Sequence, residues 1–212
     1  MIFVDRLDAG RRLAATCSTY RNEWPNPVVL GIPRGGVPVA AVVADALDAP
    51  LDVILVRKLG LPRNEEVAMG AIGEGVRVVD DGLIRVMGVT DEQLARVEER
   101  EQAELERRVR RYREGRHPVD LNGATAVVVD DGLATGATAR AACAVARAQG
   151  AASVVLAVPV APPDWEPQPG VDADSFVCVA RPSGFFAIGQ WYRDFTQTTD
   201  AEVRRLLGLP NE

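Results

Sequence analysis

Short runs of apolar and β-branched residues alternate along this chain with longer segments that are rich in alanine. Uninterrupted runs such as Val127-Val128-Val129 are typical of strands buried on both faces of a parallel sheet. The alanine-rich segments have the composition of helices. We predict strands at 28–32, 52–56, 69–72, 76–79, 125–129, 153–158 and 175–179, and helices at 8–20, 37–47, 91–113 and 136–149. A hairpin around Gly73-Glu74-Gly75 is expected to join two of the strands.

This alternation predicts an α/β fold with a doubly wound, mostly parallel sheet flanked by helices. With 212 residues, 47% of them hydrophobic, we expect one domain over residues 1–212. The segment at about 91–114 lies outside the alternation and is dense in glutamate and arginine at i,i+4 spacing. Its narrow apolar stripe predicts an inserted helix that packs on the body of the protein or on a second subunit.

Composition excludes several classes of function. The net charge of −6 argues against general affinity for nucleic acid or for anionic membranes. Residues 1–10 do not resemble a signal peptide, and no apolar run is long enough to span a bilayer, so we expect a cytoplasmic protein. Cys17, Cys143 and Cys178 are too far apart for a zinc site and are expected to be core thiols. With His117 as the only histidine, the chain has almost no material for a metal site or a Ser-His-Asp arrangement.

Candidate chemistry is concentrated after the strand at 125–129. Asp130 and Asp131 would leave the carboxyl end of that strand, at the edge where open α/β sheets bind ligands. The turn at 134–138 then opens a helix, so its unpaired N–H groups and the helix dipole favour an anion such as phosphate. Two carboxylates beside a phosphate need other partners, and vicinal hydroxyls or magnesium are suitable. The pattern therefore predicts a ribose phosphate site, with a plain Asp-Gly turn as the alternative.

Two more positions fit a site for phosphate groups. Arg34-Gly35-Gly36 also follows a strand and opens a helix, so its amides and the guanidinium of Arg34 could receive a second anion. A tight connection between strand and helix would explain the same residues. Lys58 is the only lysine among 24 lysine and arginine residues. A compact ammonium kept against that bias suits a pyrophosphate leaving group, although a single exception can also arise by chance.

The stretch from Asp130 to Thr138 resembles the phosphoribosyl-pyrophosphate signature of the type I phosphoribosyltransferases, in which two acidic residues precede a Thr-Gly-x-Thr loop. The resemblance extends over roughly 28–160, and Arg34-Gly35-Gly36 is similar to the pyrophosphate loop of that family. It implies that Asp130 and Asp131 hold the ribose hydroxyls and that 134–138 hold the 5-phosphate. Magnesium, the implied cofactor, would sit near both aspartates through substrate oxygens. The implied substrate-binding residues of the turn are Gly132, Leu133, Ala134, Thr135, Gly136, Ala137 and Thr138.

Arg57-Lys58 and Leu61-Pro62 resemble the start of the mobile catalytic loop of the family, which closes over the reacting substrates. The resemblance implies catalytic roles for Arg57 and Lys58, alongside Asp131. Closure would exclude water from the ribosyl centre. Glu65 or Glu66 could take a proton from an incoming base, and we name Glu66 as the candidate. Solvated loop acids are the alternative interpretation.

The acceptor pocket is expected in the C-terminal part, where residues at about 161–200 are similar to the hood of the family. Aromatic residues gather at 185–195, and their faces could stack on a planar base, with Phe186 and Trp191 as candidates. An aromatic core cluster is the alternative. Ala134 stands where oxopurine-specific members carry an acid. Adenine-type members share this alanine but differ at 34–36, so the acceptor stays open.

The leading hypothesis is a magnesium-dependent phosphoribosyltransferase. It would transfer the 5-phosphoribosyl group from phosphoribosyl pyrophosphate to a nitrogen nucleophile, a nucleobase in a salvage reaction, with release of pyrophosphate. We expect it to be a homodimer. The rival hypothesis is a regulator without catalytic activity that binds a phosphoribosyl ligand or nucleotide at the same site and acts through the inserted helix.

Overall fold

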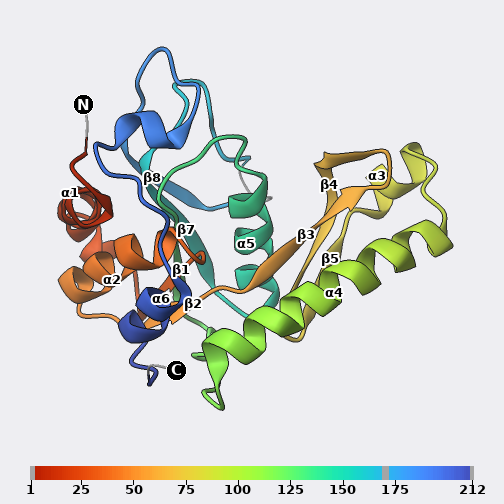
Figure 1. Ribbon diagram of the computed structural model, residues 1–212, viewed down its shortest axis with the longest axis horizontal. Coiled ribbons are helices and arrows are strands. Elements are labelled where there is room, and N and C mark those ends of the chain that lie inside the picture. The colour runs from red at the N-terminus through yellow and green to blue at the C-terminus, as the bar shows by residue number, and fades with distance from the viewer. Residues whose placement is uncertain (1–2, 169–171, 211–212) are drawn as a thin grey trace.

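The computed structural model describes residues 3–168 and 172–210, apart from the side chain of Glu66. The chain forms a five-stranded parallel sheet in the order β2-β1-β6-β7-β8 and a smaller antiparallel sheet in the order β3-β4-β5 (Figure 1). The strands are Pro27–Gly31 (β1), Leu51–Val53 (β2), Val56–Leu61 (β3), Asn64–Gly73 (β4), Val76–Val79 (β5), Thr125–Val129 (β6), Ser153–Val160 (β7) and Ser175–Ala180 (β8). The helices are Arg6–Ser18 (α1), Gly36–Leu47 (α2), Asp81–Val86 (α3), Asp91–Arg113 (α4), Ala137–Ala148 (α5) and Asp200–Leu206 (α6), with 3-10 turns at Arg21–Glu23 and Ile188–Trp191.

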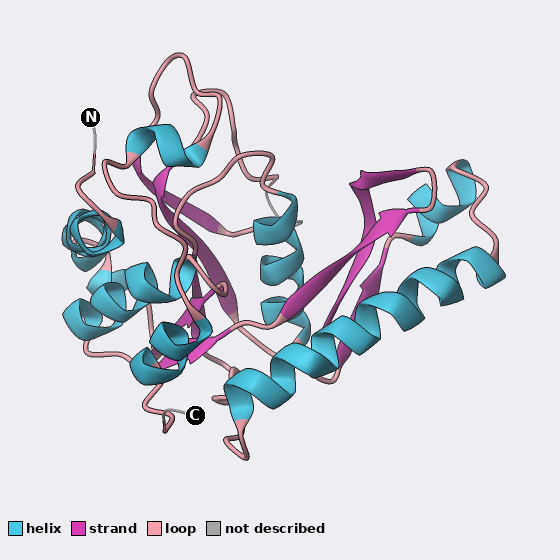
Figure 2. Cartoon of the chain, viewed as in Figure 1, coloured by secondary structure: helices cyan, strands magenta, loops and turns pink. Residues whose placement is uncertain are grey.

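The parallel sheet is built around β6, whose residues are all buried. Helices α1 and α2 cover one face of the sheet and α5 covers the other (Figure 2). The register aligns Val129 of β6 with Gly31 of β1 and Ala157 of β7, so these strands end at one edge. The predicted α/β fold with a mostly parallel sheet flanked by helices is confirmed, and β6 has the predicted bounds.

The smaller sheet corrects one expectation. The segment at 57–66, which the resemblance assigns to a mobile catalytic loop, forms the β3–β4 hairpin, which projects from the body (Figure 1). Leu59 and Leu61 are buried against α4 and its neighbours. The polar residues that suggest a loop belong to a strand with two different faces, in which side chains alternate. The expected hairpin at 73–75 is confirmed by the pairing of β4 with β5.

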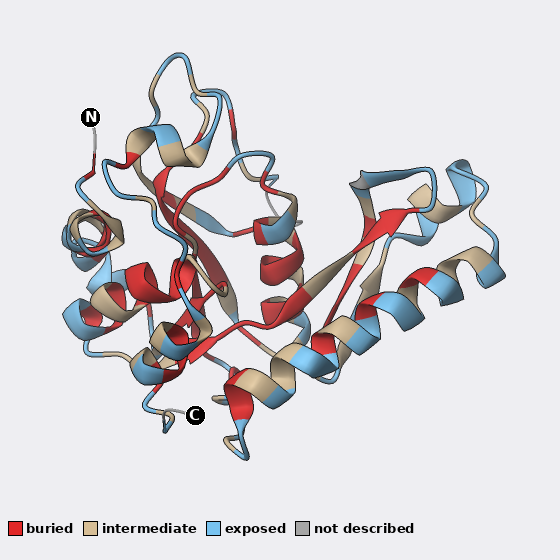
Figure 3. Ribbon diagram, in the orientation of Figure 1, coloured by how far each residue is buried: buried red, intermediate tan, exposed pale blue. Residues whose placement is uncertain are grey.

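Helix α4 is the predicted insertion, and it lies along the smaller sheet. Its start is a capping box, because the Thr90 hydroxyl accepts a bond from the Gln93 N–H and the Gln93 side chain accepts one from the Thr90 N–H. Val97, Leu105 and Tyr112 are buried in the same apolar cluster as Leu59 of β3. Figure 3 shows buried positions along α4 between exposed ones. This contact with β3 accounts for the apolar stripe. The dimer stays a prediction.

The last residue of α4 is an anchor. Arg113 is 6% exposed and forms ion pairs of 2.6 Å with Asp52 of β2 and of 2.6 Å with Glu74 in the β4–β5 turn. It also donates to the carbonyl of Val53 at 3.1 Å. The inserted helix is thereby fixed to both sheets, and its polar anchor is satisfied by several hydrogen bonds, as a buried charge requires.

Two further observations concern the rest of the chain. Burial raises the pKa of the Cys17 and Cys143 thiols to about 12, which agrees with their expected place in the core, whereas Cys178 is partly exposed. Over residues 3–168 and 172–210, the helices lack the combination of length and apolar character that crossing a bilayer needs.

Candidate active site

Asp130 and Asp131 lie at the carboxyl edge of the parallel sheet, immediately after β6. Asp131 is buried, and its Oδ2 accepts a hydrogen bond from Nε of Arg6 at 2.8 Å. Its main-chain carbonyl accepts a bond from the Tyr192 hydroxyl at 2.6 Å. Asp130 accepts the N–H of Asp131 at 2.9 Å and forms no ion pair among the described residues. One carboxylate is therefore paired with a cation and its neighbour is not.

This difference affects how the two acids titrate. Burial, followed by the negative charge of Asp131, raises the pKa of Asp130 well above its ordinary value. Burial also raises the pKa of Asp131, although the charge of Arg6 opposes the increase. A ligand that supplies hydroxyl donors or a nearby cation would favour the ionised forms. The two carboxylates are therefore suited to bind a ligand that carries hydroxyl groups or a cation.

The Arg34-Gly35-Gly36 turn links β1 to α2 and packs directly on these acids. A Cβ atom at Gly35 would lie 2.0 Å from Oδ2 of Asp131, a distance at which atoms collide. A Cβ atom at Gly36 would lie 2.6 Å from the carbonyl oxygen of Val129. Glycine is required because the backbone passes beside a carboxylate. The two turns that the sequence singles out are thus neighbours in space.

The turn from Gly132 to Thr138 leads into α5. Its residue Gly136 is the N-cap of α5 and has a φ of 77°, which favours glycine. The N–H groups of Ala134, Thr135, Gly136 and Thr138 donate no bond to any described residue. Leu133 differs, since it is buried and its N–H bonds the Val160 carbonyl at 2.9 Å. The open N–H groups at a helix start can bind an anion, while Leu133 holds the turn in place.

Trp165 supports this turn from the core side. Its Nε1 donates to the carbonyl of Thr135 at 3.3 Å, and a Cβ atom at Gly136 would lie 2.4 Å from the same nitrogen. Arg140 of α5 lies over the ring, with 5.6 Å between its Cζ and the ring centroid. Trp165 could not be identified from the sequence, because a lone tryptophan in a proline-rich segment carries no signal for a role in a turn thirty positions away.

A cavity of about 720 Å³ opens at the Arg34-Gly35 turn and Asp131. It is bounded by Arg6 of α1 and Arg34 on the sheet side, and by the last turns of α4 and the C-terminal segment opposite. Its lining includes five arginines, which are Arg6, Arg34, Arg107, Arg108 and Arg111. Two carboxylates, Asp131 and Asp200, are the acidic members of that lining. The cavity is therefore suited to anionic ligands.

A second cavity, of about 480 Å³, lies between the smaller sheet and the turn at 134–138. Thr135 and Ala137 line it from the turn, and Ala71 lines it from β4. Lys58 pairs with Ala71 across the β3–β4 ladder, and directly paired residues share a face. Lys58 therefore stands on the face of the hairpin that looks toward the turn.

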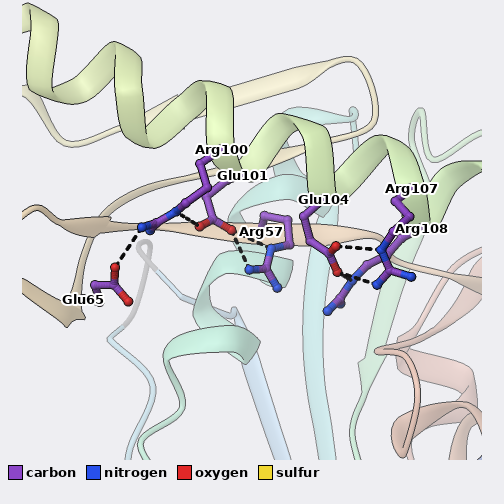
Figure 4. Close-up of polar contacts among 7 residues, drawn as sticks. All are labelled: Arg57, Glu65, Arg100, Glu101, Glu104, Arg107 and Arg108. Carbon is purple, nitrogen blue, oxygen red and sulfur yellow. Dashed lines mark hydrogen bonds and ion pairs between the residues drawn. The ribbon is translucent and has the colours of Figure 1, made fainter.

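Arg57 and Glu65 take part in a different network, which joins the hairpin to α4 (Figure 4). Arg57 Nε donates to Glu101 at 2.7 Å, and Glu65 accepts from Arg100 at 3.0 Å. These bonds turn both side chains toward the inserted helix and away from the two aspartates. The side chain of Glu66 lies outside the described part of the structure.

The aromatic residues of the C-terminal segment mainly form a small core. Phe3, Ala9, Val160 and Tyr192 are its buried members, and Phe185, Ile188, Trp191 and Phe195 pack against them. Of these, Ile188 and Phe195 reach the larger cavity. Trp191 stacks on Phe185 with 6.5 Å between ring centroids, and Phe186 is 90% exposed. The structure does not bring Phe186 or Trp191 to the cavity that Asp131 lines.

No cluster of three or more aspartate, glutamate, histidine or cysteine residues that could hold a metal ion occurs in the described ranges. Asp130 and Asp131 are neighbouring carboxylates, and Asp131 lines the larger cavity. A magnesium ion would therefore need further oxygen ligands from a substrate or from water, which is a usual arrangement for this ion.

Comparison with known proteins identifies the family. A family model described as the phosphoribosyl transferase domain matches residues 4–180, so the chain belongs to the phosphoribosyl transferase family. Two relatives, from Mycobacterium tuberculosis strains CDC 1551 and H37Rv, carry names that assign them provisionally to the phosphoribosyl transferases. Each is 54% identical over 203 residues, which cover 95% of this chain and 45% of the relative. The chain thus spans about half the length of these relatives.

Solved structures agree with this placement. The crystal structure of the protein TT1426 from Thermus thermophilus is 42% identical in sequence, with 98% of each chain covered and a TM-score of 0.88. A protein of Neisseria gonorrhoeae, 14% identical with a TM-score of 0.50 and coverage of 98% and 95%, shares the fold alone. The parallel sheet flanked by helices is therefore a fold that this chain shares with both solved structures.

Proposed function

We propose that this chain transfers the 5-phosphoribosyl group from phosphoribosyl pyrophosphate to a nitrogen nucleophile, a nucleobase, in a magnesium-dependent reaction that releases pyrophosphate. The observation that carries the proposal is the direct packing of the Arg34-Gly35-Gly36 turn on Asp130 and Asp131, next to the open amides of Ala134, Thr135, Gly136 and Thr138. Two anion sites and a pair of carboxylates between them match a ribose that bears phosphate at one end and pyrophosphate at the other. Membership of the phosphoribosyl transferase family supports this assignment.

The proposed roles follow from these positions. Asp130 and Asp131 accept hydrogen bonds from the ribose hydroxyls, and the N–H groups of the turn bind the 5-phosphate. Asp130 and Asp131 would hold magnesium through substrate oxygens, and the ion would supply positive charge that lowers the charge of the leaving group. Arg34 and the amides beside it receive pyrophosphate. Arg6 keeps Asp131 oriented through the 2.8 Å bond.

Lys58 is proposed to act from the β3–β4 hairpin. It stands on the face that looks across the second cavity to Thr135 and Ala137. Its ammonium would reach the leaving pyrophosphate only if the hairpin moved across the site toward the Arg34-Gly35-Gly36 turn, a closure that also excludes water. Arg57 supports this strand through Glu101 and so positions the hairpin on α4.

The acceptor is proposed to enter the larger cavity beside Ile188 and Phe195. Arg6 lies over the ring of Phe195, with 4.1 Å from its Cζ to the ring centroid. A planar base placed there would meet an aromatic and aliphatic wall close to Asp131. The sequence-based candidates Phe186 and Trp191 are less suited to this role because they do not line the cavity.

An assay of pyrophosphate release tests the proposed function. The protein is incubated with phosphoribosyl pyrophosphate, magnesium and each of a panel of purine and pyrimidine bases. We expect release that depends on both magnesium and one class of base. Binding of phosphoribosyl pyrophosphate without release for any base would favour the regulator, and absence of binding would contradict the transferase.

A further inference from the structure

The end of the inserted helix and the start of α6 meet at the proposed pyrophosphate turn. Asp200, the first residue of α6, accepts hydrogen bonds from Nη1 of Arg111 and from the hydroxyl of Tyr112. Its Oδ1 also lies 3.9 Å from Nη1 of Arg34. Three donors from two distant parts of the chain therefore surround a single carboxylate in the wall of the larger cavity.

Buried contacts hold these donors in place. Arg204 is 3% exposed and donates to the carbonyl of Arg111 at 2.8 Å, so α6 is tied to the last turn of α4. Tyr112 is 4% exposed. Burial, together with the hydrogen bond to Asp200, raises the pKa of Tyr112, so its hydroxyl stays a donor. Groups fixed in this way lose little freedom when a ligand binds.

The remaining arginines of the cavity are also matched by carboxylates. Arg107 and Arg108 share Glu104 at 2.8 and 2.9 Å (Figure 4), and Arg6 is matched by Asp131. The Glu104 pairs lie within one helix, whereas Asp200 belongs to another segment and reaches across to Arg34 and Arg111. Rotation of its side chain could withdraw it without disturbing α4. Among the described residues around this turn, Asp200 is the carboxylate that a phosphate group would replace most directly.

We propose that Arg34, Arg111 and Tyr112 form a phosphoryl subsite for the pyrophosphate end of the substrate, and that Asp200 occupies this subsite in the free protein and is displaced when the ligand binds. The inference rests on the proposed function for the identity of the ligand. Guanidinium groups bind carboxylate and phosphate with the same planar geometry, which makes the exchange chemically direct. The inserted helix thereby contributes to ligand binding as well as to packing.

The subsite selects by charge. A ligand group with a single negative charge gains little by replacing a carboxylate that already neutralises the same donors. A diphosphate brings more charge and more acceptor oxygens, and it can contact the N–H groups of Arg34 and Gly35 at the same time. The internal carboxylate therefore lowers affinity for weakly charged anions more than affinity for pyrophosphate.

Titration calorimetry with magnesium pyrophosphate tests the subsite on four proteins, namely the unchanged chain, Arg111→Gln, Asp200→Asn and Arg110→Gln. Arg110 is the matched control, because it lies on the same helix with a side chain 73% exposed and 4.0 Å from Glu106. We expect Arg111→Gln to weaken binding about tenfold, since a charged hydrogen bond is lost. Asp200→Asn should tighten binding about threefold or more, and Arg110→Gln should stay within about twofold.

Titration with ribose 5-phosphate separates this inference from the proposed function. All four proteins should bind that ligand alike, because it lacks pyrophosphate. Equal effects of the Arg111 and Arg110 variants on pyrophosphate would overturn the subsite, as would weaker pyrophosphate binding in a folded Asp200→Asn protein. Tyr112→Phe, expected to weaken pyrophosphate binding without removing the ring, provides a second variant if Arg111→Gln does not fold. Pyrophosphate results as expected, without transfer to any base, would contradict the proposed function and leave the subsite supported.

Discussion

Asp130→Asn is expected to lower turnover about 100-fold while making the folded protein more stable. Loss of the charged acceptor removes hydrogen bonds to the ribose hydroxyls worth roughly 2–3 kcal/mol in the proposed site. The same charge is unfavourable in the free protein, since Asp130 has no cationic partner among the described residues and its pKa is raised. We expect a gain of about 1–2 kcal/mol at pH 7, or roughly 3–6 °C in Tm.

The pH dependence of that gain follows from the sign of the shift. A carboxyl group whose pKa is raised on folding destabilises the folded state once the unfolded chain ionises, and the cost grows as pH increases toward the folded pKa. The advantage of Asp130→Asn should therefore be present at neutral pH and disappear below about pH 4, where both states are protonated. Thermal unfolding between pH 3 and 8, together with turnover, measures both effects.

Glu98→Gln is the control for Asp130→Asn. Glu98 lies on α4 and pairs with Arg77 at 2.6 Å, at the surface of the smaller sheet. Its replacement should change turnover less than twofold and stability by about 0.5 kcal/mol or less. Equal losses of turnover in the two variants would show that Asp130 has no special place in the reaction.

Arg113→Gln is expected to cost about 3 kcal/mol of unfolding free energy, which corresponds to a decrease of about 6–12 °C in Tm. The substitution leaves Asp52 and Glu74 without their shared cation, and Asp52 is 2% exposed. Asp52 retains the N–H groups of Val53 and Val119, at 2.8 and 2.9 Å, which limits the loss. Thermal and urea unfolding measure the change.

Arg110→Gln serves as the comparison for Arg113→Gln. Both residues lie in the last turn of α4, but the Arg110 side chain is 73% exposed. Its loss should cost about 0.5 kcal/mol or less. A cost below about 1 kcal/mol for Arg113→Gln would mean that apolar contacts, and not this ion-pair network, hold the inserted helix on the body.

The sequence predicts the parallel sheet well because its strands are buried on both faces and lie between alanine-rich helices. The loop expected at 57–66 is instead the β3–β4 hairpin, because Leu59 and Leu61 are buried in the apolar cluster that includes α4, while Arg57 and Lys58 beside them are half-buried. Helix α6 was missed although Thr199 and Glu202 carry a capping signal, since seven residues give little periodicity. Local patterns reveal strands and caps, but a short helix depends on its tertiary contacts.

The candidate site, like the fold, could be predicted only where a local pattern defines it. The turns at 34–36 and 130–138 could be recognised because local spacing defines an anion-binding turn. Arg6, Trp165 and Asp200 could not, because each reaches the site across the fold from a segment with no motif of its own. The structure also separates Arg57 and Lys58, which are adjacent in sequence but stand on opposite faces of β3.

A crystal structure with ribose 5-phosphate and magnesium is the most direct test of the site. We predict the phosphate at the backbone N–H groups of 134–138, with N to O distances of about 2.7–3.2 Å, and the vicinal hydroxyls at the carboxylates of Asp130 and Asp131. A sugar phosphate bound elsewhere, or one whose hydroxyls point away from both aspartates, would contradict the account.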